Sequence, residues 1–379
     1  MIFCAPPFAR AAETATPAAA EPPAYGLTGD WGGLRTKAEQ AGLTFTGTHT
    51  LDWSDPWRGA LTDRNVARGL LILQASLALA ETGTTFTAEY LDFHGRDASA
   101  DIGALMAYSN IDDTPFAHWG ELSVAQVFFS GRLRLKLGQL DANTEFDCVH
   151  DAAEFLNASA GYSPPIVGFR TYPDPALSAN VFVQATEQIS IGLGVYGNTI
   201  RSSNTGFERP FVIGEVGFNS DALGRFAVGF TQENATLTRF DSTAQNGTHA
   251  FYALAERRIW QKNATAKDDL RGLTLFAQFC AASEAVSQMS RHFALGLSGT
   301  GLVPGRDEDI CGLLGSVVVA SRADPTLTAP TEAAFECFYG LRIASFLTLK
   351  ADMQLIRHPG GQAARSDVLV GTLRLETTF

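Results

Sequence analysis

The sequence lacks any uninterrupted apolar run of the roughly 20 residues that a membrane-spanning helix needs. Its best stretch, residues 69–80, is broken by Gln74 and Ser76. This absence excludes integral helical membrane proteins, but not a transmembrane β-barrel, whose strands alternate apolar and polar residues. Charged residues make up only 18% of the chain, below the ~25% usual for soluble domains.

Signatures of nucleic-acid, metal and cofactor binding are also missing. The chain has 28 Lys and Arg against 40 Asp and Glu, a net charge of −12, and no basic cluster, so we expect no nucleic-acid partner. The five cysteines form no C-x-x-C pair and the seven histidines show no ligand spacing, which predicts no metal and no cofactor. The G-x-G-x-x-G match at Gly192–Gly197 lies in an alternating segment with no following helix. Because no hydrolase motif occurs either, we expect a protein that is not an enzyme.

The N-terminal region divides into three predicted parts. Residues 1–11 resemble the end of a secretory signal peptide, with Ala9-Arg10-Ala11 as a small-x-small cleavage site, but a basic n-region is missing. We therefore interpret them as a partial signal peptide. Residues 12–28 are rich in Ala, Pro and Thr without periodicity, which predicts a flexible linker. Residues 29–42 are expected to hold one short periplasmic helix, from Gly33 to Ala41.

From Leu43 onward, apolar and polar residues alternate with the period of half-buried strands. The pattern predicts an all-β fold: a 16-stranded antiparallel transmembrane β-barrel at residues 43–379. Its body of 337 residues leaves about 21 per strand and connection, enough for tilted spanning strands of ~9–11 residues. The predicted strands are 43–53, 68–80, 84–93, 120–129, 132–140, 178–186, 188–198, 209–219, 223–232, 248–260, 272–282, 291–300, 310–320, 333–343, 345–356 and 367–379.

Connection lengths carry a second signal. Over the first ten predicted strands, short joins such as Glu81–Gly83 alternate with long ones such as His94–Trp119 and Asp141–Leu177. Outer-membrane barrels have short periplasmic turns and long external loops, whereas a β-sandwich has no reason to keep this alternation. Later in the chain, the longer connections at 261–271 and 301–309 weaken this alternation of short and long connections. We expect residues 12–42 on the periplasmic side.

The charges within strands predict which face meets lipid. Leu133, Leu135 and Leu137 alternate with Arg132, Arg134 and Lys136 in one strand, and Leu373 and Leu375 alternate with Arg374 and Glu376 in another. Because a lipid-facing Arg at the midplane costs about 2–4 kcal/mol, the charges should face the lumen. Sixteen strands enclose more space than side chains fill. The sequence thus predicts a water-filled, charge-lined pore in a bacterial outer membrane.

Several segments, in order along the chain, resemble the carbohydrate-selective porins of the OprB family. They are Gly29-Asp30-Trp31-Gly32-Gly33-Leu34-Arg35, Leu137-Gly138-Gln139-Leu140-Asp141-Ala142-Asn143, Glu154-Phe155-Leu156-Asn157, Leu302-Val303-Pro304-Gly305-Arg306-Asp307-Glu308-Asp309 and Gln354-Leu355-Ile356-Arg357-His358-Pro359-Gly360-Gly361. The resemblance implies a 16-stranded outer-membrane channel for facilitated diffusion of sugars. It also implies that Phe379 is a signal read by the barrel-assembly machinery. Gln139 departs from the family pattern, which has a basic residue there.

Sugar hydroxyls favour charged hydrogen-bonding partners and flat aromatic faces. The candidate pore-lining residues are Glu89, Arg132, Arg134 and Lys136 from the strands, and Asp141, Asn143, Glu145, Arg170 and Tyr172 from the long loop. The alternative is that these charges only hydrate and brace the wall. Trp31 and Arg35 are expected to anchor the N-terminal helix.

The hypothesis from sequence is a channel for mono- and small oligosaccharides. A general, non-selective porin is the alternative, and a barrel enzyme with a nucleophile or acid pair near its rim is a third class. The expected partners are sugars, outer-membrane lipid and the assembly machinery, for a monomer or homotrimer. The preferred sugar does not follow from the sequence.

Overall fold

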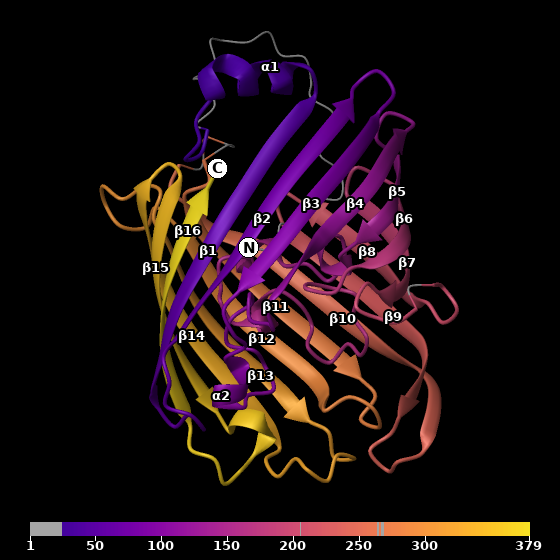
Figure 1. Ribbon diagram of the computed structural model, residues 1–379, viewed down its shortest axis with the longest axis vertical. Helices are drawn as coiled ribbons and strands as arrows, with labels where there is room; N and C mark the ends of the chain where they lie inside the picture. The colour runs from indigo at the N-terminus through magenta and orange to yellow at the C-terminus, as the bar shows by residue number, and fades with distance from the viewer. Residues whose placement is uncertain (1–24, 205, 264, 267–268) are drawn as a thin grey trace.

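The computed structural model describes residues 25–379, except 205, 264 and 267–268. The predicted signal peptide and most of the predicted linker, residues 1–24, lie outside the described residues. Within the described part, sixteen antiparallel strands close into one barrel (Figure 1). Each strand pairs with its neighbours in sequence, and β1 closes the barrel by pairing with β16. The predicted fold class is confirmed.

The observed strand bounds follow the predicted ones closely. The strands β11 and β13 have the predicted ends, whereas β9 runs six residues further than predicted. Polar residues there were expected in a loop, but they continue the β9–β10 hairpin, in which Leu237 pairs with Gln245. The strands are β1 (Leu43–Arg58), β2 (Val66–Leu79), β3 (Thr84–His94), β4 (Phe116–Phe128), β5 (Leu133–Leu140), β6 (Ala176–Gln184), β7 (Ile189–Thr199), β8 (Phe211–Ser220), β9 (Gly224–Thr238), β10 (Ala244–Gln261), β11 (Gly272–Ala282), β12 (Met289–Thr300), β13 (Ile310–Ala320), β14 (Thr331–Ala344), β15 (Leu347–Arg357) and β16 (Val368–Thr378).

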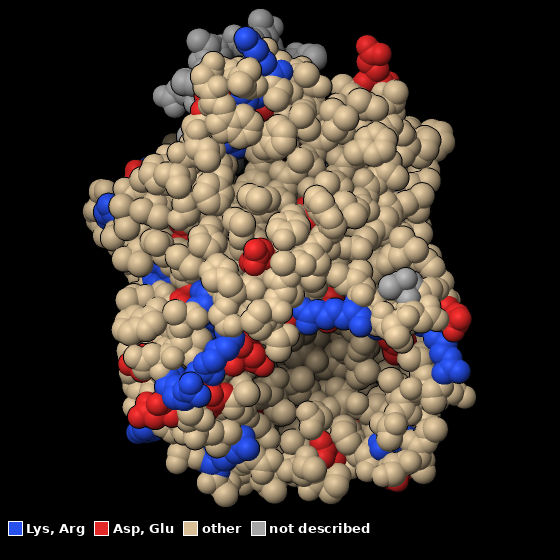
Figure 2. All heavy atoms as spheres, in the orientation of Figure 1, with Lys and Arg blue, Asp and Glu red and all other residues tan. Residues whose placement is uncertain are grey.

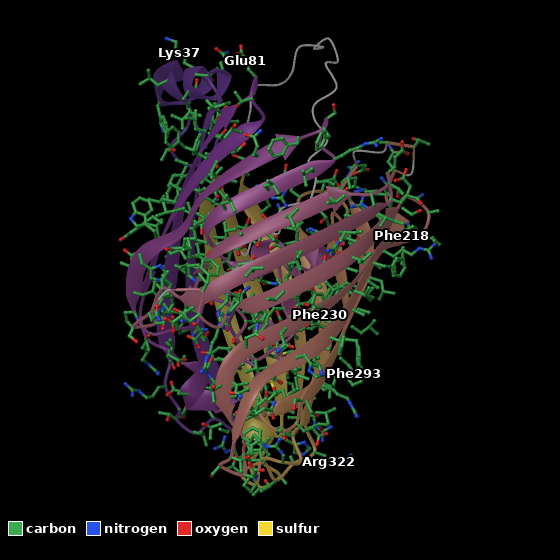
Figure 3. All side chains as sticks on the ribbon, turned by 90° about the vertical axis from the view of Figure 1, so that its right-hand side faces the viewer. Lys37, Glu81, Phe218, Phe230, Phe293 and Arg322 are labelled. Atoms are coloured by element: carbon green, nitrogen blue, oxygen red, sulfur yellow. The ribbon has the colours of Figure 1, made fainter. Side chains whose placement is uncertain are left out.

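The two ends of the barrel differ. One end, the helix end, carries α1 (Leu34–Gln40), which follows a short 3-10 turn within the predicted helical region. Lys37 and Glu81 lie at the helix end, and Arg322 lies at the opposite, loop end (Figure 3). Most connections at the helix end are short, but 262–271 and 301–309 are longer, as the sequence indicated.

Residues 25–28 of the predicted flexible linker lie against β16, where the Leu27 N–H donates to the Thr378 carbonyl at 2.7 Å.

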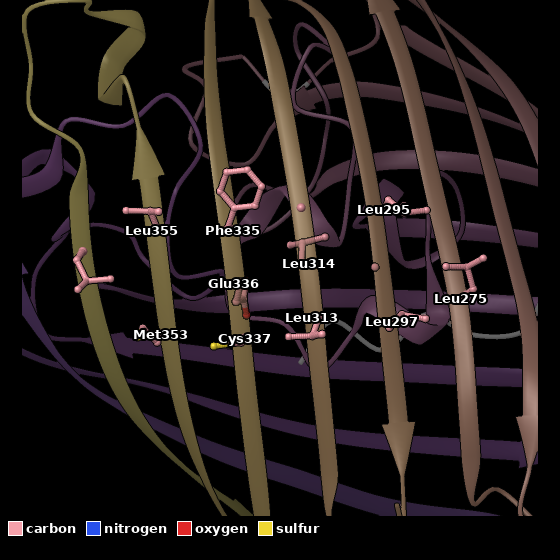
Figure 4. A pocket seen from close by; sticks show the side chains of 13 residues that line it. Leu275, Leu295, Leu297, Leu313, Leu314, Phe335, Glu336, Cys337, Met353 and Leu355 are labelled. Atoms are coloured by element: carbon pink, nitrogen blue, oxygen red, sulfur yellow. The ribbon is translucent and has the colours of Figure 1, made fainter.

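Alternation sorts the side chains of each strand between two environments. Leu373 is 44% exposed while its neighbour Arg374 is 1% exposed, so the leucine faces outward and the arginine faces the lumen. Phe230 and Phe293 likewise lie on the outer face of the wall (Figure 3). Outward side chains of β11 to β16, including Leu295 and Leu313, line a shallow apolar depression of about 480 Å³ (Figure 4). The predicted assignment of faces in β16 is confirmed.

Two long connections at the loop end fold back into the lumen. The first, 95–115, contains the short helix α2 (Ser99–Ile102), and the second spans 141–175. In the second, Phe155 packs edge-on against Phe276 and Phe338 of the wall, with ring centroids 5.5 and 4.9 Å apart. The interior is therefore partly filled by loops instead of being an open cylinder. No helix in the described part of the chain is long and apolar enough to cross a membrane.

Candidate functional site

Carboxylates on the wall hold the two inward loops by their backbone. Glu336 of β14 accepts hydrogen bonds from the N–H groups of Leu156 and Asn157, at 2.6 and 2.9 Å. Hydrogen bonds to an ionised acceptor are roughly twice as strong as neutral ones. The same arrangement recurs at three other wall glutamates. Glu332 accepts from the N–H groups of Leu105 and Met106, Glu256 from that of Asp151, and Glu215 from that of Asp147.

The loops leave a chamber against the wall of β2 to β5, with a volume of about 260 Å³. Four sequence-predicted residues line it together: Glu89, Lys136, Asp141 and Tyr172. The other lining residues are Leu70, Ile72, Gln74, Thr87, Leu91, Asn110, Ile111, Gly120, Glu121, Thr144 and Pro175. A sugar has both hydroxyl edges and apolar C–H faces, and the chamber offers polar and apolar side chains for both. From outside, a hollow opens toward the loop end, with charged side chains of both signs around it (Figure 2).

Arg134 and Lys136 project from β5 into the lumen, where carboxylates neutralise both. The Arg134 guanidinium makes a two-pronged contact with Glu145 of the long loop, at 3.0 and 2.6 Å. The Lys136 ammonium lies 3.1 Å from the same carboxylate and 2.9 Å from Glu121 of β4. All four side chains are mostly buried, so these pairs are less screened than surface ion pairs. The two cations face the lumen, as predicted, but each is paired with a carboxylate.

Arg132 is not part of this arrangement. The predicted strand began at residue 132, but β5 begins at Leu133, and Arg132 lies exposed in the turn at the helix end. Its main-chain carbonyl accepts a hydrogen bond from the Gln184 N–H at 2.9 Å, which continues the strand pairing into the turn. Because the strand ends there, the prediction that Arg132 lies on β5 beside Arg134 and Lys136 is wrong.

Asp141 and Asn143 organise the long loop where it leaves β5. The Asp141 carboxylate accepts from the backbone N–H groups of Asn143 and Tyr172, which ties the two ends of the loop together. Burial raises the pKa of Asp141 to about 6, against the opposing effect of these hydrogen bonds. Asn143 is fully buried and its amide donates to the carbonyls of Phe146 and Asp147. Its side chain therefore supports the loop from within and does not contact the chamber.

Tyr172 and Arg170 come from the end of the loop but point to different places. The Tyr172 hydroxyl donates to the Ile111 carbonyl at 2.9 Å, so it joins the two inward loops beside the chamber. Arg170 is buried away from the chamber, where it forms an ion pair with Glu233 of β9 at 2.7 Å. The prediction that Arg170 lines the pore with the other candidates is not supported by this position. It braces the loop against the wall.

Sequence reasoning missed Glu121, Gln74 and Asn110 at the chamber. Glu121 lies within an irregularity of the β3–β4 pairing, where Gly120 and Glu121 of β4 stand opposite the single residue Glu89 of β3, and this shifts which residues face the lumen. A lone alternation pattern does not reveal such a shift. Gln74 stands out in β2 as an amide within an otherwise apolar run, and that interruption was a usable signal.

Comparisons with known proteins agree with this architecture. The family model for carbohydrate-selective porins of the OprB family matches residues 73–379. Porin B of Pseudomonas aeruginosa is 23% identical, over 93% of this chain and 91% of its own. Among solved structures, the high-pH structure of Pseudomonas putida OprB aligns with a TM-score of 0.85 at 19% identity, covering 93% of this chain and 98% of that one.

A more distant fold match is the outer-membrane channel DcaP of Acinetobacter baumannii. It aligns with a TM-score of 0.57 at 10% identity, over 89% of this chain and 97% of that one. The family match spans most of the chain, and the closed barrel of sixteen strands agrees with it. The chain therefore belongs to the OprB family of carbohydrate-selective porins and is a non-enzymatic sugar channel of the outer membrane.

Proposed function

We propose that the chamber beside β2 to β5 is where a permeating mono- or small oligosaccharide makes its selective contacts. The observation that carries this proposal is the placement of polar and apolar side chains around one cavity between the wall and the inward loops. Tyr172, Leu70 and Ile72 suit the apolar face of a sugar ring, and Gln74, Glu89 and Asn110 suit its hydroxyls.

Passage by facilitated diffusion requires weak binding, because a solute held tightly leaves too slowly. We therefore expect a saturation constant near millimolar, which corresponds to about −4 kcal/mol. Facilitated diffusion through an open channel needs no conformational change of the barrel. The gradient of sugar concentration drives the flux.

The orientation and the remaining partners belong to the same proposal. The helix end faces the periplasm, since short turns are typical of that side, and the apolar outer face contacts outer-membrane lipid. The end of β16 with Phe379 is presented to the barrel-assembly machinery during insertion. The channel is a monomer or a homotrimer, which mass measurement in detergent distinguishes.

Cysteine modification with sugar protection tests the chamber directly. Thr87 lines the chamber, and Thr85 lies on the same face of β3 two residues nearer the helix end. A methanethiosulfonate reagent should modify Thr87→Cys, and glucose should slow the reaction with millimolar dependence. Thr85→Cys is the matched control, which glucose should protect less, and the wild-type protein reports the background of native thiols. If glucose leaves the Thr87→Cys rate unchanged, the sugar passes elsewhere and the proposal fails.

A further inference from the structure

Glu89 differs from the other carboxylates of the chamber in being available to a ligand. In the described part of the chain it has no salt-bridge partner, and its hydrogen bond from the Gln74 amide is long, at 3.5 Å. By contrast, Glu121 is held by Lys136 at 2.9 Å. Both Asp141 oxygens are occupied by backbone N–H groups. Glu89 is therefore the chamber carboxylate with spare hydrogen-bonding capacity.

The single cation of the chamber does not neutralise Glu89. The Lys136 ammonium lies between Glu121 and Glu145, at 2.9 and 3.1 Å, and both contacts are well formed. Three chamber carboxylates, Glu89, Glu121 and Asp141, thus face one lysine that is already shared with a fourth acid. The chamber lining therefore carries three acidic side chains against one basic side chain.

The rest of the lining limits the kind of ligand that this charge suits. Leu70, Ile72 and Leu91 give the chamber an apolar side, and its volume of about 260 Å³ is that of a small-molecule pocket instead of a wide aqueous pore. A free metal cation would make no favourable contact with the apolar side chains. The complementary ligand has one positive charge, several hydroxyls and an apolar ring face.

We propose that Glu89 is a specificity-determining residue that favours sugars carrying a protonated amine over neutral and acidic sugars. The inference rests on the proposed function of the chamber and names its preferred substrate class, the amino sugars. A protonated amine gains a charge-assisted hydrogen bond to Glu89 in a partly enclosed site. A uronic acid, by contrast, brings a like charge to a negative chamber and is disfavoured.

The test compares three hexoses of similar size in a planar bilayer at pH 7: glucosamine, glucose and glucuronate. The wild-type channel should be blocked by glucosamine with a half-saturating concentration about tenfold below that of glucose, and glucuronate should block least. Glu89→Gln should remove the glucosamine preference, so that the half-saturating concentrations of glucosamine and glucose become equal in this variant. Glu89→Asp, which keeps the charge, should retain the preference. Glu81→Gln changes an exposed glutamate at the helix end and is the matched control.

A second readout does not depend on a sugar. In a KCl gradient, the reversal potential should show cation preference in the wild type and a smaller preference in Glu89→Gln. Equal half-saturation for the three hexoses, or an undiminished glucosamine preference in Glu89→Gln, would overturn the inference. If glucose neither blocks the current nor protects Thr87→Cys, the proposed function of the chamber fails. If glucose does both and the amine brings no advantage, only the role of Glu89 fails.

Discussion

The guanidinium of Arg35 in α1 donates a hydrogen bond to the main-chain carbonyl of Phe379, the last residue, at 3.2 Å. It also donates to the Phe45 carbonyl at 2.6 Å. The pairing of β1 with the C-terminal strand extends to Gly47, whose carbonyl accepts from the Phe379 N–H at 2.9 Å, so residues 43–46 of β1 have β2 on one side and lie beyond Phe379 on the other. Arg35 thus donates to main-chain carbonyls that have no strand partner there. It links the N-terminal helix to the seam of the barrel, where β1 meets β16. This contact agrees with the expectation that Arg35 anchors the helix.

Replacing Arg35 should therefore weaken the seam. Arg35→Ala removes two hydrogen bonds from a buried cation, which are worth on the order of 2 kcal/mol together. We expect a lower temperature for loss of the folded band on semi-native gels. Lys37→Ala on the exposed side of the same helix is the control and should leave this temperature unchanged. An Arg35→Ala barrel as heat-resistant as the wild type would show that the helix contributes nothing to closure.

Replacing Arg132 and replacing Arg134 by glutamine should change the stability of the barrel by different amounts. Arg134→Gln leaves the buried carboxylate of Glu145 with Lys136 as its remaining cation, so the loss of stability should be smaller than the roughly 3–5 kcal/mol of a fully unpaired buried charge but above about 1 kcal/mol. Arg132→Gln changes an exposed turn residue and should be within about 0.5 kcal/mol of the wild type. Thermal unfolding in detergent measures both. Equal stability of the two variants would contradict the assignment of their environments.

The long loop should loosen when one of its contacts with the wall, that of Glu336, is removed. Glu336→Ala deletes the acceptor for the Leu156 and Asn157 N–H groups, so we expect a higher single-channel conductance and a weaker block by glucose. Glu336→Gln keeps one acceptor oxygen and should be intermediate. Glu308→Ala, at an exposed glutamate of the 301–309 connection, is the control. Unchanged conductance in Glu336→Ala would mean that the loop does not narrow the channel.

The long loop also predicts a pH dependence of stability. Burial raises the pKa of Asp147 to about 8 and the charge of Glu215 adds to this effect, although hydrogen bonds from Ser163 oppose it. A carboxyl with a raised pKa binds its proton more tightly in the folded state than in the unfolded state, where the pKa is about 3.9. Its contribution to stability is therefore complete below pH ~4 and is lost as the pH rises to about 8.

Asp147→Asn should flatten this dependence. Between pH 5 and 8, the unfolding temperature of the wild type should fall with rising pH, and that of Asp147→Asn should fall less. Asp241→Asn is a suitable control, because hydrogen bonds from Thr243 lower the pKa of this exposed carboxyl and place its titration below the range measured. If the unfolding temperature of Asp147→Asn falls with pH as steeply as that of the wild type, Asp147 is ionised over the whole range from pH 5 to 8.

The amino-acid sequence by itself determined the barrel. Apolar and polar residues alternate with a period of two, and connections interrupt this alternation. The pattern predicts which residues lie in strands and which face they occupy, because successive strand side chains point to opposite sides. Leu373 and Arg374 illustrate this, since their environments follow from chemistry alone. Arg134 and Lys136, which lie two residues apart on one strand, were found by the same reasoning.

Only the tertiary structure decided where the loops lie and what each charge contacts. The inward fold of 141–175 depends on wall residues remote in sequence, such as Glu336 with Asn157, and no local pattern encodes that pairing. The same applies to Arg170, which the sequence placed with the pore and which Glu233 holds elsewhere. Alternation specifies the face of a side chain, but its partner is set by the three-dimensional closure of the barrel. The selectivity of the channel depends on those partners.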